Sequence, residues 1–176
     1  AIYVDDINIF GHTTMMDHTI DILKRTFEMK DLGKTNYCLG IQFEYFKEGI
    51  FIHQSTYAKK ILLQFNMDKA HPITSPMELR SLDRDKDPFR KRGEKEPLLG
   101  SEKPYLSVIG ALTFLTNQTR PDIAFAVNLL ARHSTQPTIR HWNGVKRILR
   151  YIQGTQDMGL FFPNDSNHIL TGYADV

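Results

Sequence analysis

A run of charged residues between positions 80 and 96 constrains the fold of this 176-residue chain more than any other feature. Twelve of these seventeen residues are charged, and prolines and glycines punctuate the chain from position 88 to position 104. So polar a stretch has too few apolar side chains to offset the conformational entropy lost on folding. We therefore predict a flexible, solvated connector over residues 68–103, with one lobe of the protein on each side of it.

Composition and charge exclude several classes of protein. A single cysteine, Cys38, excludes an internal disulfide framework and a multi-cysteine zinc site and, without a secretory signal pattern, favours a reducing compartment. No apolar stretch approaches the roughly 18 residues that a membrane span needs. The net charge of +2, from 22 basic and 20 acidic side chains, is too balanced to identify a partner. Both ends of the chain read as strands cut from a larger domain, so we expect a fragment of a larger protein.

Residues 1–67 alternate between strand and helix patterns. Apolar residues recur at every second position in 2–4 and 7–9, on either side of Asp5-Asp6, as in two strands joined by a tight turn. The other elements expected in this lobe are a helix capped by Asp17 and ended by Gly33, a hairpin of residues 35–46 and 50–53, and a short helix capped by Ser55.

Three helix patterns and two strand patterns follow the connector. An apolar stripe marks the first helix over 105–115, Pro121 fits the first turn of the second, and the third runs from Pro137 to Gly154. The strands are expected near 158–162 and 168–174. Together with the first lobe, these elements predict an α+β fold.

The pair Asp5-Asp6 is the first candidate for chemistry. Two adjacent carboxylates at the tip of an apolar hairpin suit Mg²⁺, a hard cation that takes oxygen ligands, and polymerases use such geometry while phosphoryl charge develops. The alternative is an ordinary turn, since aspartate favours turns for its own local hydrogen bonds. On these residues alone the turn is the commoner explanation.

Two further features could contact nucleic acid. Gly40, in Leu39-Gly40-Ile41, marks a bend or a close approach by another backbone, with a β-bulge as the plainer alternative. Between residues 104 and 154, six basic residues face a single acidic one. On the third helix, four cations lie opposite the apolar stripe, as on a helix lying along phosphates, although a solvated face is the commoner explanation. These cations are Arg140, Lys146, Arg147 and Arg150.

Taken in order, the motifs of the chain resemble the reverse transcriptases of copia-type long-terminal-repeat retrotransposons. The segments that carry the resemblance are Tyr3-Val4-Asp5-Asp6-Ile7, residues 27–33 with Leu39-Gly40-Ile41, residues 49–54, residues 72–77, residues 112–116, residues 119–124 and residues 141–155. Only the charged connector departs from the family pattern, so the resemblance covers nearly the whole chain.

The resemblance implies a role for each segment. Residues 1–67 would be the C-terminal part of a palm, with Asp5 and Asp6 as catalytic, Mg²⁺-binding carboxylates and Leu39-Gly40-Ile41 in a hairpin that grips the primer. Residues 104–156 would be the helical thumb and connection. Residues 157–176 would begin a ribonuclease H-like domain, with Asp175 as its first metal-binding aspartate.

The family also implies partners and a compartment. The intact enzyme would bind an RNA or DNA template–primer and deoxynucleotides, together with the rest of the reverse transcriptase and ribonuclease H, in a cytoplasmic particle and with no membrane. We expect the isolated chain to lack polymerase activity, because one hairpin cannot hold two magnesium ions. Two alternatives stay open: a non-catalytic remnant that binds nucleic acid, and a product with no biochemical role.

Overall fold

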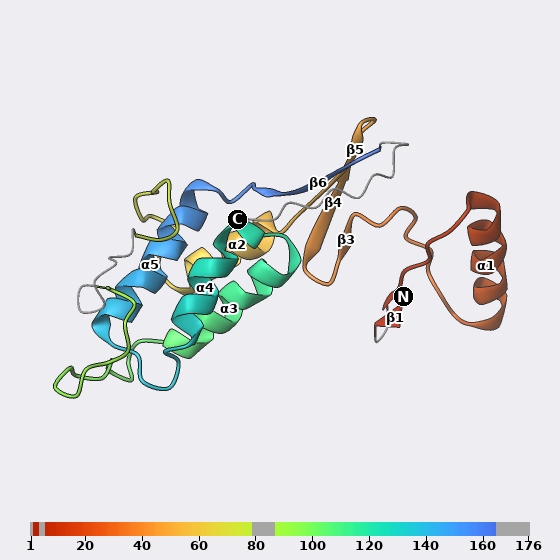
Figure 1. Cartoon of the computed structure of the whole chain (residues 1–176). Coiled ribbons are helices and arrows are strands. Elements are labelled where there is room, and N and C mark those ends of the chain that lie inside the picture. Colours follow the sequence, from red (N-terminus) through yellow and green to blue (C-terminus); the bar gives the residue numbers. More distant parts are fainter. Residues whose placement is uncertain (1, 4–5, 79–86, 165–176) are drawn as a thin grey trace, which may run out of the picture. The chain divides into compact units, whose positions relative to one another are not determined.

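The computed structural model describes residues 2–3, 6–78 and 87–164. The chain divides into two compact units, Ala1–Cys38 and Leu39–Val176. Figure 1 shows helices together with short antiparallel strands. This arrangement confirms the α+β class.

The first unit contains an N-terminal hairpin, but Asp6 lies in its second strand rather than in the expected turn, and residues 8–9 lie outside the strand. Strand β1 (Ile2–Tyr3) pairs antiparallel with β2 (Asp6–Ile7), so that Tyr3 lies opposite Asp6. Helix α1 (Thr13–Thr26) follows, and β3 (Tyr37–Cys38) ends the unit.

Two expected boundaries of α1 are wrong. The backbone carbonyl of His12 accepts the first helical hydrogen bonds, from Met15 and Met16, so the helix begins before Asp17 and contains it. The helix ends at Thr26, well before Gly33, which instead takes a positive φ of 73° while its N–H donates to Asp31 Oδ1. Asx-type turns of this kind explain the Asp-Leu-Gly sequence locally.

A three-strand arrangement and four α-helices make up the described part of the second unit. Strand β4 (Ile41–Tyr45) pairs antiparallel with β5 (Gly49–His53), which confirms the expected hairpin, and β6 (Gly159–Pro163) pairs with the other edge of β5. In Figure 1 these strands extend from one end of the helices. The strand expected over 168–174 lies outside the described residues.

The helices match the periodicity closely. They are α2 (Ser55–Gln64), α3 (Tyr105–Gln118), the single 3₁₀ turn η2 (Pro121–Ile123), α4 (Ala124–Ala131) and α5 (Ile139–Gly154). Their apolar faces form one core, in which Val108, Leu112, Val145, Ile148 and Ile152 are completely buried. The expected stripes of α3 and α5 therefore do face the core.

The capping of α2 differs from the expectation. Ser55 is the first helical residue rather than the cap, and its hydroxyl lies 2.7 Å from His53 Nδ1. The side chain of Gln42, from β4, supplies the missing acceptor: its Oε1 accepts the N–H of Thr56 at 2.9 Å. A cap from a neighbouring strand satisfies the same unpaired helix-end donors as a local one.

The charged segment is not solvated throughout, so that expectation is wrong for its described part. Asp87 and Phe89 are buried, and Leu99 donates its N–H to the carbonyl of Pro137. Of the charged residues described after them, Lys91, Glu94 and Lys95 are exposed, whereas Glu96 is largely covered. No helix within the described ranges has the length and apolar character required to cross a bilayer.

Candidate functional site

The candidate catalytic hairpin is described only in part. The backbone of Asp6 begins β2 opposite Tyr3, whereas Asp5 and Asp175 lie outside the described residues. Among the residues that the structure describes, no three histidine, cysteine, aspartate or glutamate side chains converge as metal ligands. The metal-binding roles of Asp5, Asp6 and Asp175 stay predictions.

Leu39 and Gly40 form a turn immediately before β4. Both take positive φ values, 51° and 81°, which glycine adopts freely and leucine rarely. A Cβ added to Gly40 would lie 3.4 Å from the Phe114 ring of α3, which in turn packs edge-on against Tyr57 with ring centroids 4.9 Å apart. The close approach at Gly40 therefore comes from a side chain of α3.

The three arginines of α5 are engaged within the chain. Arg140 donates to both carboxylate oxygens of Glu96 at 2.7 Å, and Arg147 lies 3.2 Å from Glu78 Oε1. Arg150 Nε donates to the backbone carbonyl of His71 at 2.8 Å. Lys146 is partly exposed. The predicted phosphate contacts of these four residues have not been tested, but three of the four cations already have partners in the folded chain.

Arg120 forms a buried ionic cluster that the sequence pattern did not reveal. Its side chain is 2% exposed, and it donates through Nε and Nη2 to the two carboxylate oxygens of Asp122, at 2.9 and 2.8 Å. It also donates to the carbonyl and hydroxyl oxygens of Thr155, at 2.7 and 2.8 Å. The guanidinium carbon lies 5.7 Å from the ring centroid of Tyr151. Arg120 therefore links η2 to the end of α5.

Asp122 is held in its charged form by this arrangement. Burial alone would raise the pKa of its carboxyl group, but the hydrogen bonds and charge of Arg120 outweigh burial and hold the pKa below its ordinary value. An aspartate charged across the neutral pH range is the partner that a buried guanidinium requires.

Two buried histidines stack between α4 and α5. The rings of His133 and His141 are 3.9 Å apart and nearly parallel, at 4°. Nδ1 of His141 accepts the N–H of Thr138 in a capping box at the start of α5, so its proton is on Nε2, which donates to the carbonyl of Arg90. Nε2 of His133 donates to the carbonyl of Phe89 at 2.8 Å. The two rings therefore hold a segment of the chain against α5.

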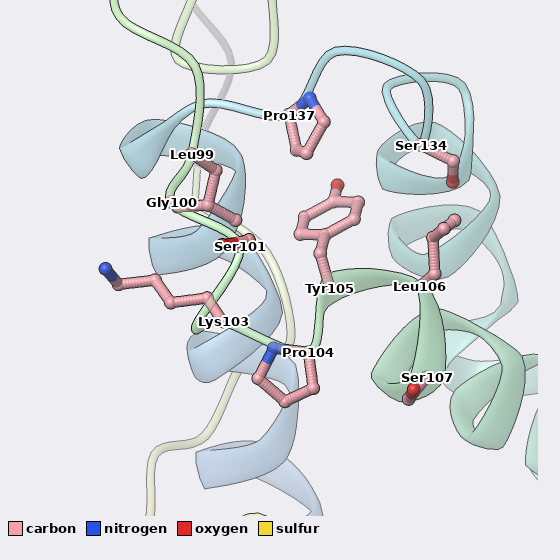
Figure 2. A pocket seen from close by; sticks show the side chains of 10 residues that line it. All are labelled: Leu99, Gly100, Ser101, Lys103, Pro104, Tyr105, Leu106, Ser107, Ser134 and Pro137. Carbon is pink, nitrogen blue, oxygen red and sulfur yellow. The ribbon is translucent and has the colours of Figure 1, made fainter.

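A shallow hollow of about 290 Å³ lies at the N-terminal end of α3. Figure 2 shows Tyr105 rising between Leu99 and Pro137 on one side and Ser134 on the other. The Tyr105 hydroxyl donates to the carbonyl of Leu130 at 2.8 Å and is therefore satisfied by the protein. Among the described residues that line the hollow there is no carboxylate, so the hollow does not suit a magnesium site.

Comparison with known proteins identifies the family. Residues 1–79 match the family model "Reverse transcriptase (RNA-dependent DNA polymerase)". The chain is 35% identical to the retrovirus-related Pol polyprotein from transposon RE2 of Arabidopsis thaliana, over 99% of the chain and 12% of that protein. It is 34% identical to the corresponding polyprotein from transposon TNT 1-94 of Nicotiana tabacum, over 99% of the chain and 13% of that protein.

The chain also matches a shorter relative, and there it covers most of that relative's length. The uncharacterized mitochondrial protein AtMg00810 of Arabidopsis thaliana is 35% identical over 99% of the chain and 69% of its own length. The chain belongs to the copia-type reverse transcriptase family. No solved structure matches it.

Membership in the reverse transcriptase family divides the site residues into two groups. The family model covers Asp5, Asp6 and the Leu39-Gly40 turn, whereas α3, α4 and α5 lie beyond it and are matched through the polyproteins. The chain spans about an eighth of the Pol polyproteins that it matches. These polyproteins therefore contain far more than the matched segment.

Sequence reasoning missed three groups of residues in this reverse transcriptase segment. These are the Arg120 cluster, the stacked His133 and His141, and the Glu96–Arg140 pair. The Thr138-x-x-His141 spacing resembles a capping box, with histidine in the place of the usual glutamate, and could have been found. Arg120 and Asp122 are two positions apart and His133 and His141 eight, but the contacts of Arg120 with Thr155 and of Arg140 with Glu96 join residues 35 and 44 positions apart, which no local pattern predicts.

Proposed function

We propose that this chain supplies part of an RNA-directed DNA polymerase of a copia-type retrotransposon, acting on a template–primer duplex and deoxynucleotides. In this proposal residues 1–67 belong to the palm, residues 104–156 to the thumb and connection, and residues 157–176 to the start of a ribonuclease H-like domain. The carrying observation is the similarity to Pol polyproteins over 99% of the chain, with Asp5-Asp6 inside the reverse transcriptase match. The intact enzyme would work in a cytoplasmic particle.

The donor set at the hairpin fits a divalent cation. Carboxylate oxygens suit Mg²⁺, and β2 fixes the backbone of Asp6 beside Tyr3 on a paired strand. Asp5 and Asp6 would hold the ion, and Asp175 would do so in the ribonuclease H-like part. When bound, the metal supplies charge neutralisation to the phosphoryl group. The hairpin's own contribution would be to carry two aspartates that are adjacent in the sequence.

Part of this proposal can be tested on the chain itself. Binding of a 20-base-pair RNA–DNA duplex is expected to weaken steeply with salt, because phosphate contacts release counterions. Three such contacts would give a slope of about −2.7 in log affinity against log salt, a loss of about fortyfold between 50 and 200 mM. Fluorescence anisotropy across that range measures the slope directly.

Lys146 provides a matched comparison in the same assay. Lys146→Gln should reduce the slope by about 0.9 if this partly exposed cation contacts a phosphate. Lys30→Gln makes the same change in charge on an exposed residue of the first unit and should reduce it less. A flat salt response of the unaltered chain would contradict nucleic-acid binding by this surface.

A further inference from the structure

Residues 87–96, called the strap below, lie across α5. Phe89 is buried against the helix at Gly144, where an added Cβ would come within 3.0 Å of the Phe89 ring. The backbone of the strap is held at two consecutive carbonyls, those of Phe89 and Arg90, by the Nε2 donors of His133 and His141. The strap is therefore packed and hydrogen-bonded in place.

The strap carries a carboxylate to Arg140. Glu96 accepts two parallel hydrogen bonds from Nε and Nη2 of Arg140, both 2.7 Å long, and the carbonyl of Pro88 accepts a third from Nη1. The hydrogen bonds from Arg140 hold the pKa of Glu96 well below its usual range, at about 2, so the carboxylate is charged at neutral pH. This carboxylate thus pairs with Arg140 and also lies 3.9 Å from Nη1 of Arg90, on the strap itself.

The other arginines of α5 are covered in a similar way. Arg147 pairs with Glu78, and Arg150 donates to the carbonyl of His71, both from the chain that precedes the strap. The side chain of Glu78 is more than half exposed, so this pair contributes little to stability. Each of the three arginines on the basic face of α5 therefore already binds an acceptor from the same chain.

A planar guanidinium presents the same pair of donors to a carboxylate and to a phosphate, so one group excludes the other. We propose that Glu96 competes with nucleic-acid phosphate for Arg140, which makes the strap an autoinhibitory contact that limits the affinity of α5 for a duplex. This inference rests on the proposed function, because it requires that the chain bind nucleic acid. Removing the Glu96 charge while keeping its shape leaves Arg140 without a competing anion, held only by neutral acceptors such as the carbonyls of Pro88 and Arg90.

Glu96→Gln is the direct test, with the 20-base-pair RNA–DNA duplex as the probe. The variant is expected to bind about threefold tighter at 50 mM salt and to have a slope steeper by about 0.9, as one additional phosphate contact would give. Glu102→Gln is the matched control: it makes the same change in charge at a carboxylate that pairs with Lys103 rather than with an arginine of α5. The control should gain less than half as much.

A second substitution assigns the gain to Arg140. In the Glu96→Gln background, Arg140→Gln should return affinity and slope to the unaltered values, and circular dichroism should show that each variant is folded. If Glu96→Gln unfolds the chain, Glu78→Gln frees Arg147 at an exposed pair and should steepen the slope in the same way. Equal affinities for the unaltered chain, Glu96→Gln and Glu102→Gln would overturn the inference.

The two proposals fail differently. Absence of duplex binding by the unaltered chain and by all variants would overturn both the nucleic-acid interface and the competition. Duplex binding that is equally strong in all of them would leave the interface intact and overturn the competition alone.

Discussion

Replacing Arg120 with methionine is expected to lower the free energy of unfolding by about 2–3 kcal/mol. The substitution removes a guanidinium that is 2% exposed and leaves the Asp122 carboxylate and the Thr155 carbonyl without their donor. The loss comes from the charge-assisted hydrogen bonds of the buried guanidinium, while the Asp122 carboxylate, 28% exposed, regains part of its solvation. The loss should exceed that of an ordinary surface substitution severalfold.

Urea unfolding followed by circular dichroism measures this difference. Arg132→Met is the matched control: Arg132 is an exposed arginine next to the end of α4, and its replacement should change stability by no more than about 0.5 kcal/mol. If the two variants lose the same stability, Arg120 does not hold η2 to the end of α5 as described.

The stability of the second unit should fall by about 3 kcal/mol between pH 6.5 and pH 4 because of His141. Burial is the largest cause that lowers the pKa of this imidazole from 6.5 to about 4. The hydrogen bond to the Arg90 carbonyl raises this pKa, whereas the charges of His133 and Arg140 lower it. Between these two pH values the unfolded chain binds a proton that the folded chain excludes. The contribution is complete above pH 6.5 and is lost as the pH falls toward 4.

The capping box gives a structural reason for this exclusion. Nδ1 of His141 accepts the Thr138 N–H at 3.1 Å, so a proton added there would replace the acceptor with a donor facing a donor. A charged ring would also lie 3.9 Å from the ring of His133, the pKa of which burial lowers as well. Protonation of His141 would therefore destabilise both the capping box at the start of α5 and the stacked histidine pair.

His141→Gln separates this contribution from the others. Glutamine at this position of a capping box can still accept the Thr138 N–H but does not titrate. We expect a flatter dependence of stability on pH between 4 and 6.5, measured by urea unfolding at four pH values. His71→Gln, at an exposed histidine, should leave the dependence of the unaltered chain in place. The same steep loss in all three proteins would contradict the assignment to His141.

The elements that the sequence predicted well are those with strong local periodicity. The stripes of α3 and α5, the Pro121 start and the β4–β5 hairpin depend on neighbours a few residues apart, and all are confirmed. Expected boundaries were wrong where a different group supplied the acceptor: the His12 carbonyl for α1 and the Gln42 side chain for α2. Helix ends depend on single hydrogen bonds, which a pattern of apolar residues does not contain.

The candidate site was less predictable, for a physical reason. The sequence showed that the cations and the apolar residues of α5 lie on opposite faces of the helix. The partners of Arg140, Arg147 and Arg150, however, come from 44 to 79 residues away in the chain. A charge-rich segment suggested solvent, whereas its Phe89 and its two bonded carbonyls place it against α5. Contacts between residues far apart in the sequence, apolar and hydrogen-bonded as well as ionic, therefore place this segment.

Primer extension by a chimera tests the central proposal most directly. This chain would replace the matching stretch of the RE2 polyprotein, to which it is 35% identical, and the unaltered RE2 polyprotein would be assayed beside it. We predict Mg²⁺-dependent extension of a primer on an RNA template, reduced about a thousandfold by Asp5→Asn or Asp6→Asn because charge stabilisation at the reacting phosphate is lost. Asp17→Asn, on α1, should have no effect. Extension that persists with both Asp5 and Asp6 replaced, or an inactive chimera beside an active RE2 polyprotein, would contradict the proposal.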